Sequence, residues 1–302
     1  MTGRHPRETG KRSRHYDGPF PTSTIPAVNI ATVPQRSPLR YPGGKTWLIP
    51  HIREWLGRTP PHPLLVEPFA GGGIVSLTAV MERLVERALM VDLDRDIAAF
   101  WRAALCYGPD LAARVQRFTP TRDRIEELAG QAPRDVIEHG FRTLVLNRTR
   151  RGGVLAPGAA LTKKGENGQG VASRWYPVTL RKRLAAISSC SERITFCEAD
   201  GVRLLEDVAL HRTDACFFID PPYTAGGKRA GSRLYAHNTV DHVKLFELMA
   251  ASRTDFMMTY DCSDEIVSLV RAHGFHAAVV VMKNSHHARL PELVITRDRL
   301  FT

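Results

Sequence analysis

Three short motifs hold most of the residues that could do chemistry. The first, VEPFAGGG at 66–73, follows an apolar run and precedes a helical pattern. Its glycines, among them Gly71 and Gly73, let a ligand approach the backbone, and the following helix offers free N–H groups. Asp92 ends the next apolar run, where doubly wound folds hold a ribose diol with a carboxylate. Together these features predict an adenosine-type cofactor site; a tight strand–helix turn without ligand is the structural alternative.

The second motif is YPGGKT at 41–46, whose ending resembles a phosphate-binding loop. A true P-loop has a glycine five residues before Gly44, but Leu39 occupies that position, so a nucleoside triphosphatase is rejected. Tyr41 and Lys45 could instead hold a carboxylate at a glycine-rich turn. A simple turn at the start of a helix explains the motif equally well.

The third motif is FFIDPPYTAGG at 217–227, in which an apolar strand ends at Asp220. Pro221 and Pro222 stiffen the backbone and leave the Pro221 carbonyl free to accept a hydrogen bond. A carboxylate and a carbonyl form an acceptor pair for an exocyclic amino group, and Tyr223 could stack on its ring. Orienting such an amine would direct its nitrogen lone pair at an electrophile. A plain turn is the alternative.

Charge is distributed unevenly along the 302 residues, which carry 42 Lys and Arg against 31 Asp and Glu. Residues 100–190 have a net charge of +9 and residues 1–36 of +4, whereas the remainder has −2. A confined positive region favours a polyanionic partner, nucleic acid first. The apolar runs are too short to span a bilayer, and the five cysteines form no CxxC pair. We therefore expect no membrane association and no metal.

Short apolar runs alternate with helical patterns after residue 37, which predicts an α/β fold with a parallel, doubly wound sheet. The predicted strands are 64–67, 88–92, 194–197, 215–220, 256–260, 275–282 and 293–296. Only a polar loop separates the last two, so we expect an antiparallel hairpin at the end. A helix is predicted from 74 to 86.

Three regions follow from this pattern. Residues 1–36 read as a disordered basic tail, with ordered sequence beginning at Ser37. Residues 37–99 and 191–302 form the catalytic domain. Residues 100–190 interrupt the alternation and are interpreted as an inserted, mainly helical subdomain.

The motifs GGK at 43–45, FxGxG at 69–73 and DPPY at 220–223, in this order, resemble those of the Dam-type (alpha-group) adenine-N6 DNA methyltransferases. LNRT at 146–149 and TYD at 259–261 are similar too, and the resemblance runs from about residue 37 to 302. It implies a Rossmann-like, seven-stranded S-adenosylmethionine-dependent methyltransferase fold that transfers a methyl group to adenine N6 in double-stranded DNA, with the target base flipped out. The residues implied to bind the cofactor are Tyr41, Lys45, Phe69, Gly71, Gly73, Asp92, Asp200 and Asp220.

By the same resemblance, the target base is received by Asp220, Pro221, Pro222 and Tyr223, with no metal required. Tyr41 and Lys45 are implied to contact the methionine part of the cofactor. Residues 100–190 become the target-recognition domain, and the basic residues expected to contact DNA are Arg148, Arg150, Arg151, Lys163, Lys164 and Arg174. A solvated basic face is the alternative for each of them.

Other functions remain open from the sequence. They are cytosine-N4 methylation of DNA, adenine methylation of RNA, and a catalytically silent DNA-binding relative. A restriction endonuclease would accompany the enzyme in a restriction–modification pair. We expect a cytoplasmic protein of a prokaryote or virus, associated with the nucleoid through DNA. Many relatives have an aromatic residue and Asn after the Asn-Arg-Thr run; here Arg150, Arg151 and Gly152 follow, which leaves the recognised sequence undetermined.

Overall fold

The computed structural model describes residues 18–26, 29–41, 43–58, 61–156, 158–165, 168–222, 240–283 and 289–301. Within them, seven strands form one sheet in the order β3-β2-β1-β4-β5-β7-β6. All neighbouring pairs are parallel except those made by β7, which runs antiparallel to both β5 and β6. The strands are β1 (His62–Glu67), β2 (Val85–Asp92), β3 (Ile194–Glu198), β4 (Ala215–Ile219), β5 (Phe256–Asp261), β6 (His276–Lys283) and β7 (Arg289–Thr296).

The sheet is buried on both faces, as parallel sheets are in α/β proteins. Side chains alternate between the faces with a period of two: Phe217 and Ile219 of β4 join one apolar core, and Phe218 joins the other. Three helices, α8 (Gly201–Val208), α10 (His242–Ala251) and α11 (Asp264–Ala272), supply the first core, and α1 (Ile49–Gly57), α2 (Ile74–Met81) and α3 (Arg95–Cys106) supply the second. The predicted α/β class and the terminal hairpin are confirmed.

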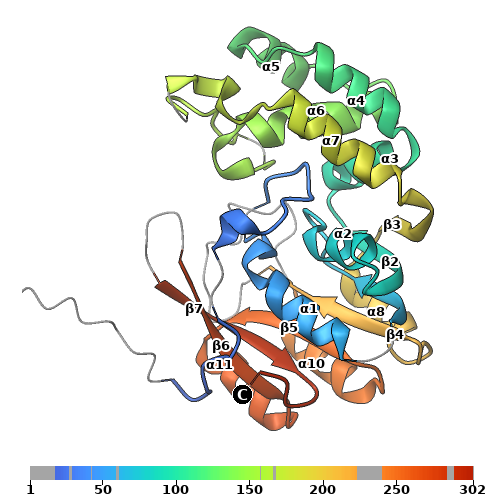
Figure 1. The fold of residues 1–302 in the computed structure, drawn as a ribbon, viewed down its shortest axis with the longest axis vertical. Coiled ribbons are helices and arrows are strands. Elements are labelled where there is room, and N and C mark those ends of the chain that lie inside the picture. Colours follow the sequence, from blue (N-terminus) through green and yellow to red (C-terminus); the bar gives the residue numbers. More distant parts are fainter. Residues whose placement is uncertain are drawn as a thin grey trace, which may run out of the picture.

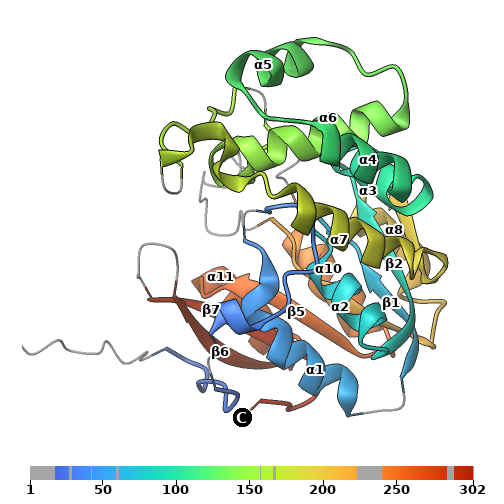
Figure 2. The ribbon, with the colours of Figure 1, turned by 45° about the horizontal axis from the view of Figure 1, so that its top comes forward.

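Between β2 and β3 the chain forms a block of helices that gathers at the top of the molecule in Figures 1 and 2. After α3 come α4 (Gly108–Arg117), α5 (Arg122–Gly130), α6 (Val136–Thr149) and α7 (Pro177–Ser188), with short 3₁₀ turns at Arg151–Gly153 and Gly170–Arg174. Gly140 brings α6 close to α3, because a Cβ there would lie 2.5 Å from Ala103 Cβ. The proposed domain boundary at residue 100 thus falls inside α3, which packs on both the sheet and the block.

The helix predicted from 74 to 86 is shorter in the structure. It ends at Met81, and β2 already begins at Val85. Arg83, which has a φ of 58°, turns the chain between them, because a left-handed residue cannot continue a right-handed helix. The predicted helix was too long because Val85, the first residue of β2, suits either kind of element.

The tail prediction needs correction for the part that the structure describes. Residues 18–26 lie along the outer edge of β6, where Thr22 bridges Val279 in parallel. Val33 is buried in the core, and Arg36 forms an ion pair with Glu82 at 2.7 Å. An unpaired sheet edge offers free backbone groups, and an extended, Pro-rich segment can satisfy them without a periodic pattern. Order therefore begins well before Ser37.

Candidate active site

A cavity of about 580 Å³ lies at the carboxyl ends of the central strands. The chain leaves β1 toward β2 and β3, then returns to place β4 on the other side of β1. Ligands in doubly wound folds bind outside such a switch in strand order, because the loops diverge there and leave a crevice. Residues that follow β1, β2 and β4 line this cavity, together with residues of α6 and of the turns before α7.

The glycine-rich turn after β1 is built by close packing. Gly71 has a φ of 46°, and a Cβ at this position would lie 2.6 Å from Cε1 of Tyr41. Gly73 has a φ of 59°, and a Cβ would lie 2.6 Å from Met90 Cε. The indole N–H of Trp101 donates to the Gly71 carbonyl at 2.9 Å. Only glycine fits both positions, so the turn is held against the Tyr41 ring, with α2 starting directly behind it.

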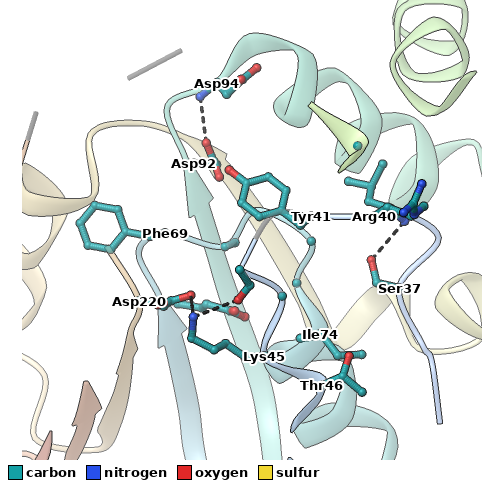
Figure 3. A pocket seen from close by; sticks show the side chains of 18 of the residues that line it. Ser37, Arg40, Tyr41, Lys45, Thr46, Phe69, Ile74, Asp92, Asp94 and Asp220 are labelled. Atoms are coloured by element: carbon teal, nitrogen blue, oxygen red, sulfur yellow. Dashed lines mark hydrogen bonds and ion pairs between the residues drawn. The ribbon is translucent and has the colours of Figure 1, made fainter. Parts of the chain in front are cut away.

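Asp92, at the end of β2, holds this turn from the neighbouring strand. Its Oδ2 accepts from the backbone N–H of Gly71 at 2.8 Å, and its Oδ1 accepts from that of Asp94 at 2.9 Å. Asp94 in turn caps the N-terminus of α3. Figure 3 shows Asp92 beside the Tyr41 ring, with both residues directed into the cavity. Each carboxylate oxygen has a second lone pair, so Asp92 can still accept from a ligand.

Glu67 is a second acid at the end of β1 and is 3% exposed. It accepts from both the backbone N–H and the hydroxyl of Ser76 in the first turn of α2. Burial raises the pKa of Glu67 to about 8, the Ser76 hydrogen bonds oppose this, and the negative charges of Asp220 and Asp92 add to it. The Glu67 carboxyl is therefore largely protonated at neutral pH in the ligand-free protein.

Asp220, directly after β4, is held at both carboxylate oxygens. Lys45 Nζ lies 2.9 Å from its Oδ2, and the hydroxyl of Thr259 on β5 donates to its Oδ1 at 2.6 Å. The same ammonium contacts Oε1 of Glu292 on β7 at 3.1 Å and the carbonyl of Gly43 at 2.9 Å. Burial lowers the pKa of Lys45, but the ion pairs with Asp220 and Glu292 outweigh it and raise this pKa above its usual value. Figure 3 shows the Lys45–Asp220 contact below Tyr41.

The rest of the third motif is only partly described. Pro221 is buried and does not line the cavity, whereas Pro222 does. Tyr223, expected to stack on the base, lies outside the described residues.

Arginines from the helical block and from the loop before Tyr41 also line the cavity and are called its basic wall: Arg40, Arg148, Arg174 and Arg183. Arg148 is buried, and its Nε donates to the carbonyl of Arg174 at 2.8 Å. Burial, together with the nearby positive charges of Arg183, Arg40 and Arg174, lowers the pKa of Arg148 to about 10. The cavity thus has both an acidic wall at the strand ends and this basic wall.

The structure brings together ten of the residues that the sequence singled out. Those lining the cavity are Tyr41, Lys45, Phe69, Gly73, Asp92, Asp200, Asp220, Pro222, Arg148 and Arg174. Gly71 contacts the site through Asp92 instead. Asp200 also caps α8, accepting from the N–H of Val202 at 2.8 Å. The predicted DNA contacts that do not line the cavity are Arg150, Arg151, Lys163 and Lys164.

Sequence reasoning missed Glu67, Thr259 and Glu292 as site residues. Glu67 ends a predicted strand just as Asp92 does, so the same rule would have found it. Glu292 carries a weaker signal, a single acid inside the apolar run LPELVIT. Its closeness to Lys45 depends on β7 inserting between β5 and β6, which no local pattern announces.

Sheet order and site together define an α/β protein with a cofactor-type cavity at the switch point. Residues 41–131 match the family model described as D12 class N6 adenine-specific DNA methyltransferase. Two relatives named DNA adenine methylase, from two strains of Vibrio cholerae serotype O1, are each 28% identical over 212 residues. This alignment covers 68% of the present chain and 71% of each relative. The resemblance to the adenine-N6 DNA methyltransferases predicted from the motifs is confirmed by this family model and by these two relatives.

Solved structures show more distant likenesses. A precorrin-6y C5,15-methyltransferase from Geobacter metallireducens aligns with a TM-score of 0.37 and 11% identity, covering 93% of this chain and 94% of its own. An rRNA methyltransferase from Streptomyces viridochromogenes aligns with a TM-score of 0.38 and 15% identity, covering 90% and 86%. Likenesses at this level say nothing about the site. Within the described residues, no helix is long and apolar enough to cross a membrane.

Proposed function

We propose that this protein transfers a methyl group from S-adenosylmethionine to the N6 amino group of adenine in double-stranded DNA, and that the cavity is its active site. The observation that carries the assignment is the meeting of Asp220, Asp92 and the glycine-rich turn in one cavity. Asp220, the expected acceptor for an amino group, and Asp92, the expected acceptor for the cofactor ribose, then line the same cavity.

The residues present fit S-adenosylmethionine. Gly73 lines the cavity directly before the N-terminus of α2, whose free N–H groups can meet a ligand, and Asp92 offers acceptors for ribose hydroxyls. The cavity volume of about 580 Å³ lies in the range of small-molecule sites. When bound, this cofactor supplies an electrophilic methyl group on a positively charged sulfur, a charge that the acidic wall would favour.

Asp220 would act on the amino group of the target base. Its carboxylate and the Pro221 carbonyl would accept the two N6 hydrogens, which directs the nitrogen lone pair toward the methyl group. The Asp220 carboxylate would stabilise the positive charge that develops on the nitrogen when the methyl group passes to it from the sulfur, which would leave as a neutral thioether. The amine then loses a proton to its surroundings. Tyr223 would stack on the flipped base.

The basic wall would bind the DNA backbone. Like charges around Arg148 already oppose its ionisation, so a phosphate placed among Arg148, Arg174 and Arg183 would relieve that repulsion. Residues 100–190 would serve as the target-recognition insert, in which exposed Arg151, Lys163 and Lys164 extend the basic surface beyond the cavity.

Purified protein, isotopically labelled cofactor and defined substrates test the proposal. We expect label on adenine N6 of duplex DNA and a loss of at least about 100-fold in rate for Asp220→Ala, because an acceptor used in the transition state is removed. Asp214→Ala, which changes an exposed carboxylate in the loop before β4, is the matched control. Label on cytosine or only on RNA would refute the substrate, and full activity of Asp220→Ala would refute the mechanism.

A further inference from the structure

We propose that Glu292 and Lys45 are a positioning pair for Asp220, the carboxylate that would receive the target amino group. The inference rests on the proposed methyl transfer. It begins from the burial of the three side chains: Lys45 is 4% exposed, Glu292 3% and Asp220 22%.

The hydrogen-bonding capacity of Lys45 is already used. A lysine ammonium has three hydrogens, and three acceptors lie within 3.1 Å of Nζ, namely Asp220 Oδ2, Glu292 Oε1 and the Gly43 carbonyl. The ammonium therefore joins Asp220 and Glu292 into one buried cluster.

Two residues hold Asp220 directly, and Glu292 anchors one of them. The Thr259 hydroxyl holds Oδ1 from β5, and Lys45 holds Oδ2 from the loop before α1. Glu292 anchors Lys45 from β7, the strand that inserts antiparallel beside β5. In the pairing of β5 with β7, Glu292 lies opposite Asp261, which is two residues after Thr259 along β5. A catalytic group held in this way has little freedom to leave its productive orientation.

The second acid also sets the charge of the cluster. Lys45 with Asp220 alone would form a neutral pair, in which the ammonium offsets the carboxylate that faces the substrate. With Glu292 sharing the ammonium, Lys45, Asp220 and Glu292 carry a net charge of −1. This residual charge faces an amino group that becomes positive as the methyl group arrives. Glu292 thus supports the reaction without touching the substrate.

The test compares Glu292→Gln with the wild-type protein in single-turnover methylation and in calorimetric titration of the cofactor. We expect the methyl-transfer rate to fall about 100-fold, the effect of a misplaced catalytic group, while the cofactor dissociation constant changes less than about threefold. Glu292→Asp, which keeps the charge but shortens the reach, should recover part of the rate. Glu82→Gln is the matched control, because Glu82 also lies between two cations, Arg36 and Arg53, but away from the cavity.

A double-mutant cycle separates a positioning pair from a cofactor contact. Lys45→Met leaves the buried Glu292 and the partly buried Asp220 without their cation, so it should lower the urea midpoint, and adding Glu292→Gln should raise that midpoint again. We expect Glu292→Gln to cost no further rate in the Lys45→Met background. Equal rate losses in both backgrounds, or a tenfold weaker cofactor affinity in Lys45→Met with an unchanged transfer rate, would overturn the inference. The urea measurement does not use activity, so it distinguishes this failure from failure of the proposed function.

Discussion

Replacing Glu67 with Gln should change how the stability of the protein depends on pH. Glu67 is buried at the end of β1, and burial raises its pKa from 4.5 to about 8. An acid whose pKa is raised in the folded state contributes stability that is fully present below the unfolded pKa and is lost as pH rises through the folded pKa. The wild-type protein should therefore lose this contribution between about pH 4.5 and pH 8, while Glu67→Gln has no such proton to lose.

The size of the effect follows from the shift. One pKa unit corresponds to about 1.4 kcal/mol, so the full shift corresponds to about 5 kcal/mol, of which about 3 to 4 kcal/mol falls between pH 5 and pH 8. From pH 5 to pH 8, the unfolding free energy of Glu67→Gln should therefore rise relative to that of the wild type by about 3 to 4 kcal/mol. The amide oxygen of Gln can still accept from the Ser76 N–H, so the cost of the substitution itself should stay nearly constant with pH.

Urea unfolding of both proteins at half-unit steps from pH 5 to pH 8.5 measures this difference. Glu82→Gln is the control: hydrogen bonding by Arg53 lowers the pKa of Glu82, so this group is ionised in both folded and unfolded protein over that range. Glu82→Gln should change the free energy of unfolding by the same amount at every pH in this range. A Glu67→Gln difference that stays flat from pH 5 to pH 8 would refute the reasoning, because it would mean that Glu67 ionises normally in the folded protein.

Two further predictions concern packing and DNA binding. Gly140→Ala should cost about 1 to 3 kcal/mol in urea unfolding, because its Cβ would lie 2.5 Å from Ala103 Cβ and 2.9 Å from the Ala99 carbonyl oxygen. Gly130→Ala at the end of α5, with no atom within 4 Å of its Cβ, should be neutral or slightly stabilising; equal costs would contradict close packing of α3 and α6. Neutralising the exposed basic residues of the insert should reduce the slope of log affinity against log salt by roughly 0.9 for each DNA phosphate that is no longer neutralised, whereas the same change on exposed arginines near the amino ends of the strands should leave it unchanged. The insert set is Arg151, Lys163 and Lys164, and the control set is Arg87, Arg253 and Arg271. An unchanged slope for the insert set would mean that these three side chains face solvent in the complex.

The alternation of apolar runs and helical patterns was enough to predict the strands and the α/β class. Each apolar run is a local feature of the sequence, and a parallel sheet that is buried on both faces requires such runs in its strands. The motifs were informative for the same reason. Gly71, Asp92 and Asp220 each stand at or just after the end of a strand, and the carboxyl ends of parallel strands meet at one edge.

Local patterns could not supply what depends on pairing over long separations. The N-terminal segment 18–26 has no periodicity of its own, and it is placed by pairing with β6 and by contacts with His51 and Phe301 far along the chain. The length of α2 was decided by the left-handed turn at Arg83, which arginine seldom adopts and which no propensity predicts.

From the sequence alone, three motifs in a fixed order carried the resemblance to the adenine-N6 DNA methyltransferases, because each motif is local and follows its own strand or turn. The tertiary structure alone decided what surrounds Asp220. Lys45, Thr259 and Glu292 are far apart in the chain, and they meet because β5 lies beside β4 and β7 inserts beside β5. Burial then sets their charges, and burial is a property of the folded molecule that no single segment contains.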